Sequence, residues 1–128
     1  MLSSRSVLIF LSAAAIACAP PSGARPARDA NVITREELDA SVARNAYDAI
    51  QNLRPNFLRS RGTQTFDPTV STQAAIYLDG QRYGDVTALK SMLVDAIDQI
   101  RYLSAADATS RYGTNHTAGA IEVTTRKR

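Results

Sequence analysis

Apolar positions repeat with a helical period in the first half of the chain and, after residue 73, mostly with a strand period. Over residues 38–53 they recur every three or four positions, at Leu38, Val42, Ala46, Ala49, Ile50 and Leu53. This spacing predicts one amphipathic helix. Thr34 and Glu37 have the spacing of a capping box at its start. Pro55 disfavours helical geometry in the residue before it, which ends the helix.

Short apolar or alternating runs predict strands in the second half. Ala74–Leu78 is the first, and Asp79-Gly80 predicts a two-residue hairpin turn, because both positions of that turn need positive φ. Gln81–Tyr83 is the returning strand. Apolar and polar residues alternate in Gln99–Leu103 and in Ala120–Thr125, which predicts two further strands.

Shorter elements fill the intervals between these strands. Phe57 and Leu58 are expected to form a short strand. Asp85 is expected to cap a second helix with one apolar face, made by Val86, Leu89 and Leu93. Ala105–Tyr112 suits a short helix closed by Gly113, where left-handed geometry is easy for glycine. The whole pattern predicts a small α+β domain with a mixed β-sheet and short flanking helices.

The N-terminus has the pattern of a bacterial lipoprotein signal. Arg5 precedes the apolar run VLIFLSAAAI at 7–16, which is too short to span a bilayer. The run ends in Ala15-Ile16-Ala17-Cys18, which resembles a lipobox. We therefore expect a signal peptide over 1–17 and a lipid on Cys18. An ordinary secretory signal cut after Ala17, which leaves a free thiol, is the alternative.

Length and composition limit the mature chain to one small domain without disulfides. Residues 18–30 comprise the lipidated cysteine and a flexible tether rich in Pro, Ala and Arg. The folded domain is expected over 31–128. Cys18 is the only cysteine, so the packed core alone must stabilise the domain. The formal net charge of +3 does not indicate a nucleic-acid partner.

Four segments in the second half resemble the plug domain of TonB-dependent outer-membrane receptors. In order they are IYLDG at 76–80, DQIRYL at 98–103, SRYG at 110–113 and AGAIEVTTRK at 118–127. They match the family's strand with an Asp-Gly turn and its later unit of strand, short helix, glycine and final strand. The stretch before them resembles the opening of a plug, so the resemblance covers nearly all of 31–127.

The resemblance implies a compact plug-like unit, in which Gly119 lets the chain bend before the last strand. Three features depart from the family pattern. Ala105-Ala106 replaces the Gly-Pro that usually comes after the first strand of the unit, residues 19–30 contain no clear TonB box, and no barrel-forming segments come after the plug-like unit. We therefore expect a plug domain without a barrel, attached to the membrane by lipid instead.

Few residues suggest chemistry, and neither a cofactor nor a metal is expected. His116, the only histidine, is expected to be solvent-exposed in a polar loop. Asp95 and Asp98 could share a face and hold a cation, although a solvated pair is the simpler interpretation. Ser104, Ser110 and Thr109 lie near Asp107, but no nucleophile elbow accompanies them. We therefore do not expect an enzyme.

Basic and aromatic residues supply the candidate binding positions. Arg54, Arg59 and Arg61 surround Phe57 and are either attracted to anionic lipid headgroups or simply part of a solvated loop. Four tyrosines, Tyr77, Tyr83, Tyr102 and Tyr112, are expected to pack on the sheet, and an exposed subset could form a contact patch. The binding positions that we expect are Arg59, Arg61, Tyr77 and Tyr83.

These features together predict a non-enzymatic interaction module anchored by lipid at the periplasmic face of the outer membrane. Its expected partners are the membrane, through the lipid, and an outer-membrane or periplasmic protein, with a β-barrel among the candidates. An alternative is a periplasmic lipoprotein that binds a small ligand or a polysaccharide through residues 60–73 and exposed tyrosines. An enzyme is the third and least supported possibility.

Overall fold

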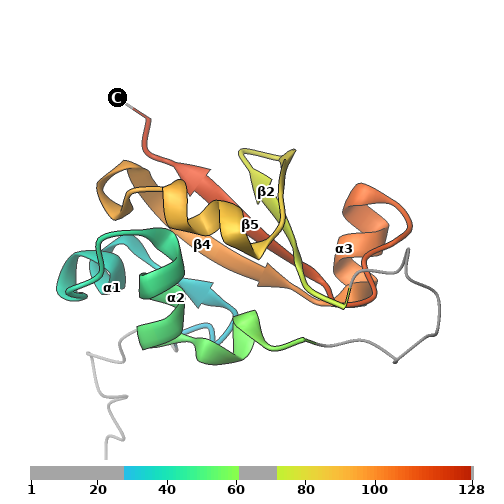
Figure 1. Ribbon diagram of the computed structural model, residues 1–128, viewed down its shortest axis with the longest axis horizontal. Helices are drawn as coiled ribbons and strands as arrows, with labels where there is room; N and C mark the ends of the chain where they lie inside the picture. The colour runs from blue at the N-terminus through green and yellow to red at the C-terminus, as the bar shows by residue number, and fades with distance from the viewer. Residues whose placement is uncertain (1–27, 61–71, 128) are drawn as a thin grey trace, which may run out of the picture.

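A computed structural model describes residues 28–60 and 72–127 (Figure 1). The signal peptide, Cys18, most of the tether and Arg61 lie outside these residues, and the predictions about them stay predictions. The strands are β1 (Val32–Ile33), β2 (Ala75–Leu78), β3 (Gln81–Gly84), β4 (Ile97–Leu103) and β5 (Ala120–Thr125). The α-helices are α1 (Arg35–Ala40), α2 (Ala46–Leu53) and α3 (Ala105–Tyr112). The 3-10 helices are η1 (Pro55–Leu58), η2 (Val86–Ser91) and η3 (Val94–Ala96).

The five strands form one mixed sheet in the order β1-β4-β5-β2-β3. β5 lies antiparallel to β4 and parallel to β2, and β3 returns antiparallel beside β2. The two-residue strand β1 pairs with β4 at the other edge. The predicted α+β fold with a mixed sheet and short helices is therefore confirmed.

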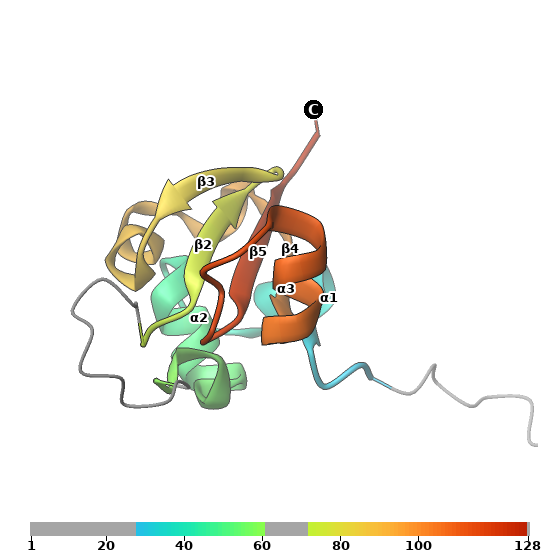
Figure 2. The ribbon, with the colours of Figure 1, turned by 90° about the vertical axis from the view of Figure 1, so that its right-hand side faces the viewer.

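Both faces of the sheet are covered. The larger core lies on the face that α2 and the 3-10 helices cover, and α3 packs against the other face (Figure 2). β5 is the central strand, and its residues Ala120 to Val123 are all buried, including the polar Glu122. The expected alternation of Ile121 and Val123 toward one face therefore holds, but the opposite face of β5 is buried as well.

The single helix expected over residues 38–53 is wrong, because the chain breaks it into α1 and α2. Residues 44–46 pair instead with residues 92–94, through an isolated bridge between Asn45 and Leu93 and two flanking backbone hydrogen bonds. Asn45 then caps α2 by accepting from the backbone N–H of Asp48 at 2.8 Å. Val42, which was expected on the apolar face, is 98% exposed.

Two other short elements differ from their predictions. Phe57 and Leu58 belong to the 3-10 helix η1 rather than to a strand, and Phe57 stacks on Tyr102 in the core with 5.3 Å between ring centroids. The helix capped by Asp85 is the 3-10 helix η2, in which Val86 and Leu89 are buried. It ends at Ser91, so Leu93 lies outside it and is exposed.

The predicted turns and helix ends are confirmed where glycine or a cap determines them. Asp79 and Gly80 have φ of 49° and 85°, as the hairpin turn requires. Gly113 closes α3 with φ of 89°. Glu37 accepts from the backbone N–H of Thr34 at 3.3 Å, on the reverse side of the capping box. Among the described residues, no helix is both long and apolar enough to cross a membrane.

Candidate functional site

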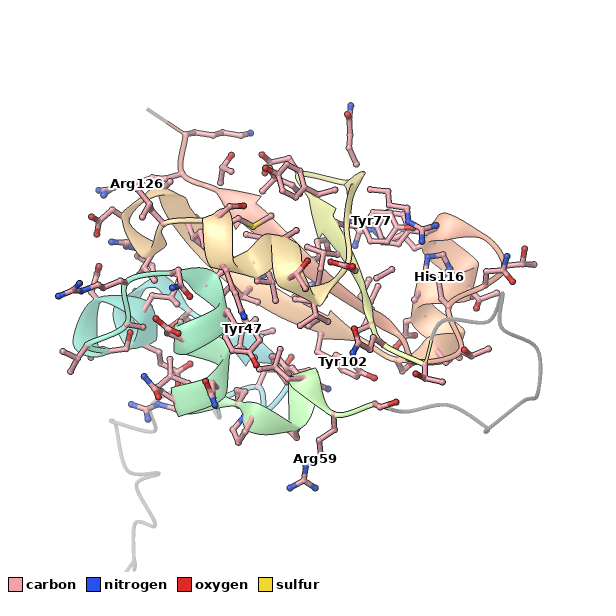
Figure 3. The ribbon with its side chains drawn as sticks, in the orientation of Figure 1. Tyr47, Arg59, Tyr77, Tyr102, His116 and Arg126 are labelled. Atoms are coloured by element: carbon pink, nitrogen blue, oxygen red, sulfur yellow. The ribbon has the colours of Figure 1, made fainter. Side chains whose placement is uncertain are left out.

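A buried cluster of polar aromatic side chains joins α3 and the loop after it to the sheet. The phenol of Tyr77 on β2 lies 2.7 Å from Nε2 of His116, and Nδ1 of His116 lies 2.8 Å from the carbonyl oxygen of Gly113 (Figure 3). Only an N–H can satisfy that carbonyl, so Nδ1 carries a proton, and in the neutral ring Nε2 accepts from Tyr77. The ring of Tyr112 on α3 stacks on Tyr77 with 3.7 Å between centroids.

Glu122 extends this cluster into the central strand. Its Oε1 accepts from the Tyr112 hydroxyl at 3.0 Å and lies 2.9 Å from the guanidinium of Arg111. Burial, followed by the hydrogen bond and the negative charge of Glu122, raises the pKa of Tyr112. The side chain of Glu122 is almost fully buried, so these partners replace the water that its charge would otherwise need.

The expectation that His116 is a solvated loop residue is wrong. It is 5% exposed, and both ring nitrogens are bonded within the domain. A histidine held in this way fixes the loop between α3 and β5, because one ring nitrogen is bonded to the Tyr77 phenol and the other to the carbonyl of Gly113. These contacts therefore hold α3 and the loop after it against β2 and β5. They are made by Tyr77, Tyr112, His116, Glu122 and Arg111.

Hydrogen bonds to Asp79 also connect the Asp-Gly turn to the end of β5. The carboxylate of Asp79 accepts from the backbone N–H of Thr125 at 2.8 Å and from its hydroxyl at 2.6 Å. These hydrogen bonds, the hydroxyl first, lower the pKa of Asp79. The aspartate of the turn therefore holds the β2–β3 hairpin against the last strand.

The serine and aspartate near α3 act as a helix cap rather than as part of a catalytic group. The hydroxyl of Ser104 donates to Asp107 at 2.7 Å and accepts from its backbone N–H at 3.2 Å. This cap starts α3 at Ala105, where the family pattern has Gly-Pro. In the described part of the chain, no three His, Cys, Asp or Glu side chains group closely enough to hold a metal ion.

The structure separates the four expected binding positions. Tyr77 is 5% exposed and bonded to His116, so it lies in the interior rather than in a surface patch. Tyr83 is 52% exposed on the edge strand β3. Arg59 is exposed and points away from the domain (Figure 3), and Arg61 lies outside the described residues. A binding role for each of these residues stays a prediction.

Arg54, one residue of the expected basic cluster, forms an ion pair within the domain. Arg54 lies 3.1 Å from Glu37, and another nitrogen of its guanidinium donates to the carbonyl of Leu53. Its charge is therefore used to join the end of α2 to the start of α1. Arg59 is left as the exposed cation of this cluster among the residues that the structure describes.

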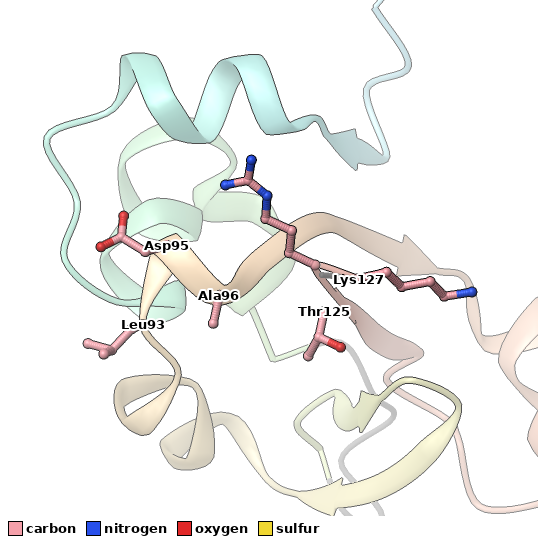
Figure 4. Close-up of a pocket in the computed structure, with 6 residues that line it drawn as sticks. Leu93, Asp95, Ala96, Thr125 and Lys127 are labelled. Carbon is pink, nitrogen blue, oxygen red and sulfur yellow. The ribbon is translucent and has the colours of Figure 1, made fainter.

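An open hollow lies at the end of β5, with a volume of about 630 Å³ (Figure 4). It is lined by Leu93, Asp95, Ala96, Thr125, Arg126 and Lys127. Its charges have both signs, and Leu93 is its only large apolar side chain. This lining lacks the apolar walls and convergent polar groups that a small-molecule site usually has.

Sequence reasoning missed the polar cluster because its members come from different parts of the chain. Tyr77 and His116 are separated by 39 positions. The available signal was Glu122, a charged residue between the apolar Ile121 and Val123 of a predicted strand, since such a residue needs a buried partner if the strand is central in its sheet.

The chain matches the sequence model of a known protein family. The sequence model of a protein family described as TonB-dependent Receptor Plug Domain matches residues 25–120. This span contains β1 to β4 and all the helices of the described residues, and it ends at the first residue of β5. No curated protein matches the chain significantly.

Proposed function

The chain belongs to the TonB-dependent receptor plug domain family, and we propose that it acts as a non-enzymatic interaction module of the bacterial cell envelope, anchored by lipid. The family is one of outer-membrane receptors, which gives the chain a cell-envelope context. Two finer parts of the proposal go beyond the family: a lipid on Cys18 and a protein partner in the outer membrane or periplasm.

The observation that carries the proposal is that a plug domain and a segment resembling a lipobox occur in the same chain. The match to the plug family covers residues 25–120, and the apolar run before it ends in Ala15-Ile16-Ala17-Cys18. Lipoprotein processing leaves several acyl chains on such a cysteine, and two or more chains hold a protein durably on a membrane. The lipid would therefore keep the plug domain at the membrane surface.

We assign the module a binding role rather than a catalytic one. His116, the single histidine, is hydrogen-bonded to Tyr77. Ser104 and Asp107 cap the first turn of α3. Every buried side-chain nitrogen and oxygen in the described residues has a hydrogen-bond partner within the domain. We therefore place recognition on the surface of the domain.

The anchor can be tested by replacing its cysteine. Cys18→Ser should abolish labelling by a fatty-acid analogue and release the protein from the membrane fraction into the periplasm. Ser22→Ala, a substitution in the tether that leaves the lipobox-like segment intact, is the control and should behave as wild type. A Cys18→Ser protein that is still labelled and membrane-bound would refute lipid anchoring without affecting the family assignment.

The interaction role can be tested by chemical crosslinking in intact cells. The full-length protein should be recovered in a reproducible complex with one outer-membrane or periplasmic protein. The Cys18→Ser protein should give less of the complex, because the lipid concentrates the domain at the membrane. Repeated recovery of the chain alone, at native expression levels, would contradict the interaction role.

A second candidate function is the binding of a small ligand or a polysaccharide. The observation that favours it is the 52% exposure of Tyr83, since exposed tyrosines often contact such ligands. A ligand that binds the folded state should raise the melting temperature, and the rise should disappear in Tyr83→Ala. If a solute library gives no rise in wild type, this alternative is excluded for the solutes tested.

A further inference from the structure

β3 forms an outer edge of the sheet. It pairs with β2 on one side, and in the order β1-β4-β5-β2-β3 no described strand lies beyond it. Gln81, Arg82 and Tyr83 are all exposed along this strand. An open edge presents backbone N–H and C=O groups to an extended chain and is a ready site for strand addition.

The register of the hairpin shows which groups face outward. Leu78 and Gln81 flank the two-residue turn and form the hydrogen-bonded pair that closes it, and Tyr77 and Arg82 form the next pair. Pairs in an antiparallel ladder alternate, so this second pair does not exchange backbone hydrogen bonds. The N–H and C=O of Arg82 therefore point away from β2, toward the open edge.

The opposite edge of the sheet is less suitable for strand addition. β1 has only two residues, and α1 begins after one further residue. β3 has four residues, and Tyr83 within it adds a large, half-exposed aromatic surface. Tyrosine is among the residues that most often dominate binding energy at interfaces.

We propose that the edge of β3 binds an extended segment of another protein, which adds a strand beside Arg82 and places an acidic residue next to its guanidinium. This inference rests on the proposed function, because it names the surface through which the interaction module would act. The side chain of Arg82 makes no hydrogen bond or ion pair with another described residue, so its charge is available to such a partner.

A second copy of the chain is a poor occupant of this edge. If two copies of β3 paired antiparallel about Arg82, the two guanidinium groups would lie opposite each other. Like charges in directly opposed positions destabilise strand pairing, whereas an acidic residue there stabilises it. The charge on β3 therefore favours a different protein over self-association.

A strand of four residues buries little surface, so the complex should be short-lived, as small interfaces usually are. Site-specific photocrosslinking captures such complexes in the cell. The experiment uses the full-length protein with a photoreactive amino acid in place of Gln81, and a second protein with the same group in place of Thr109 on α3 as the control. Both positions are exposed.

Three substitutions at residue 82 separate backbone pairing from charge. Arg82→Pro removes the outward N–H, which is tolerated on an edge strand because that group is not bonded to β2. Arg82→Ala keeps the N–H and removes the charge, and Arg82→Glu reverses it. Relative to wild type, we expect crosslinking from position 81 to fall at least tenfold in Arg82→Pro and Arg82→Glu, and severalfold in Arg82→Ala. Thermal unfolding checks that each variant folds, and Arg82→Glu keeps the test valid if Arg82→Pro does not.

The outcomes distinguish the edge from the wider function. Crosslinks from position 81 that map to an acidic, extended segment of one envelope protein, and that respond to residue 82 as expected, support the proposal. Crosslinks to a second copy of this chain, or equal yields in folded Arg82→Glu and wild type, overturn it. A partner captured only from position 109 refutes binding at the β3 edge and is consistent with the interaction role. If neither position captures a partner, both proposals are contradicted.

Discussion

Asp79 and Thr125 lie 46 positions apart in the sequence, and the carboxylate of Asp79 accepts hydrogen bonds from both the backbone N–H and the hydroxyl of Thr125. Asp79 is also in the left-handed region, with φ of 49°. One residue therefore shapes the β2–β3 turn and fastens it to the end of β5. This dual role gives a physical reason for an aspartate at this position of the family's Asp-Gly turn.

Asp79→Asn should lower the free energy of unfolding by about 1 kcal/mol, because a neutral amide replaces the charged acceptor at an exposed site. Asparagine tolerates left-handed geometry, so the turn itself is preserved. Asp98→Asn, which changes an exposed aspartate of β4, should have a much smaller effect and is the control. Urea unfolding measures the stability of both variants. Equal stabilities would show that the hydrogen bonds between Asp79 and Thr125 do not stabilise the domain.

The same carboxylate should make stability depend on pH. Its pKa is lowered in the folded state from an ordinary value of 3.8. The unfolded chain therefore binds the proton more readily, and the contribution of Asp79 is full above that value and is lost as pH falls through the folded pKa. The difference in stability between wild type and Asp79→Asn should be constant near neutral pH and shrink below about pH 4. A difference that grows on acidification would contradict this assignment.

Gly119→Ala should destabilise the domain far more than Gly80→Ala. Both glycines have positive φ, 82° and 85°, so both substitutions carry a similar backbone strain of about 1 kcal/mol. At Gly119 the added Cβ would also lie 2.4 Å from the carbonyl oxygen of Leu103 and 2.6 Å from the hydroxyl of Tyr102, whereas nothing lies within 4 Å at Gly80. We expect the melting temperature of Gly119→Ala to be at least 10 °C below that of Gly80→Ala, since 1 kcal/mol corresponds to about 4–8 °C in a domain of this size.

Tyr77→Phe should cost about 1–3 kcal/mol, because it leaves Nε2 of the buried His116 without its phenol partner. Tyr83→Phe removes the same hydroxyl from an exposed ring and should change stability by less than about 0.5 kcal/mol. Chemical unfolding of the two variants compares them directly. If they were equally stable, the hydrogen bond between Tyr77 and His116 would not contribute to the fold.

The elements that the sequence predicted correctly are those that local chemistry determines. The Asp79-Gly80 turn needs residues that accept positive φ, Gly113 ends α3 for the same reason, and the capping box at Thr34 acts within one turn of a helix. The order of strand, helix and strand in the plug-like unit is also determined by turn and capping residues along the chain. These features require no knowledge of distant contacts.

The errors came from contacts between distant segments. His116 is in a polar loop, but Tyr77 on β2 bonds to it and helps to bury it. The helical spacing of residues 38–53 was real, yet residues 44–46 gain backbone partners from residues 92–94 that a continuous helix would exclude. Periodicity reports which residues are apolar, and it does not show where a competing partner interrupts an element.

Asn45→Ala tests this interruption. Asn45 accepts from the backbone N–H of Asp48 at 2.8 Å and donates to its carboxylate at 2.9 Å, so it caps α2 where the single helix was expected to continue. If the break is real, alanine should remove the cap and lower the free energy of unfolding by about 1 kcal/mol. In a continuous helix, alanine would instead be the better helix former and would raise it. Asn52→Ala, on the exposed surface of α2, is the control and should be neutral or slightly stabilising, so opposite signs at the two asparagines would establish the break.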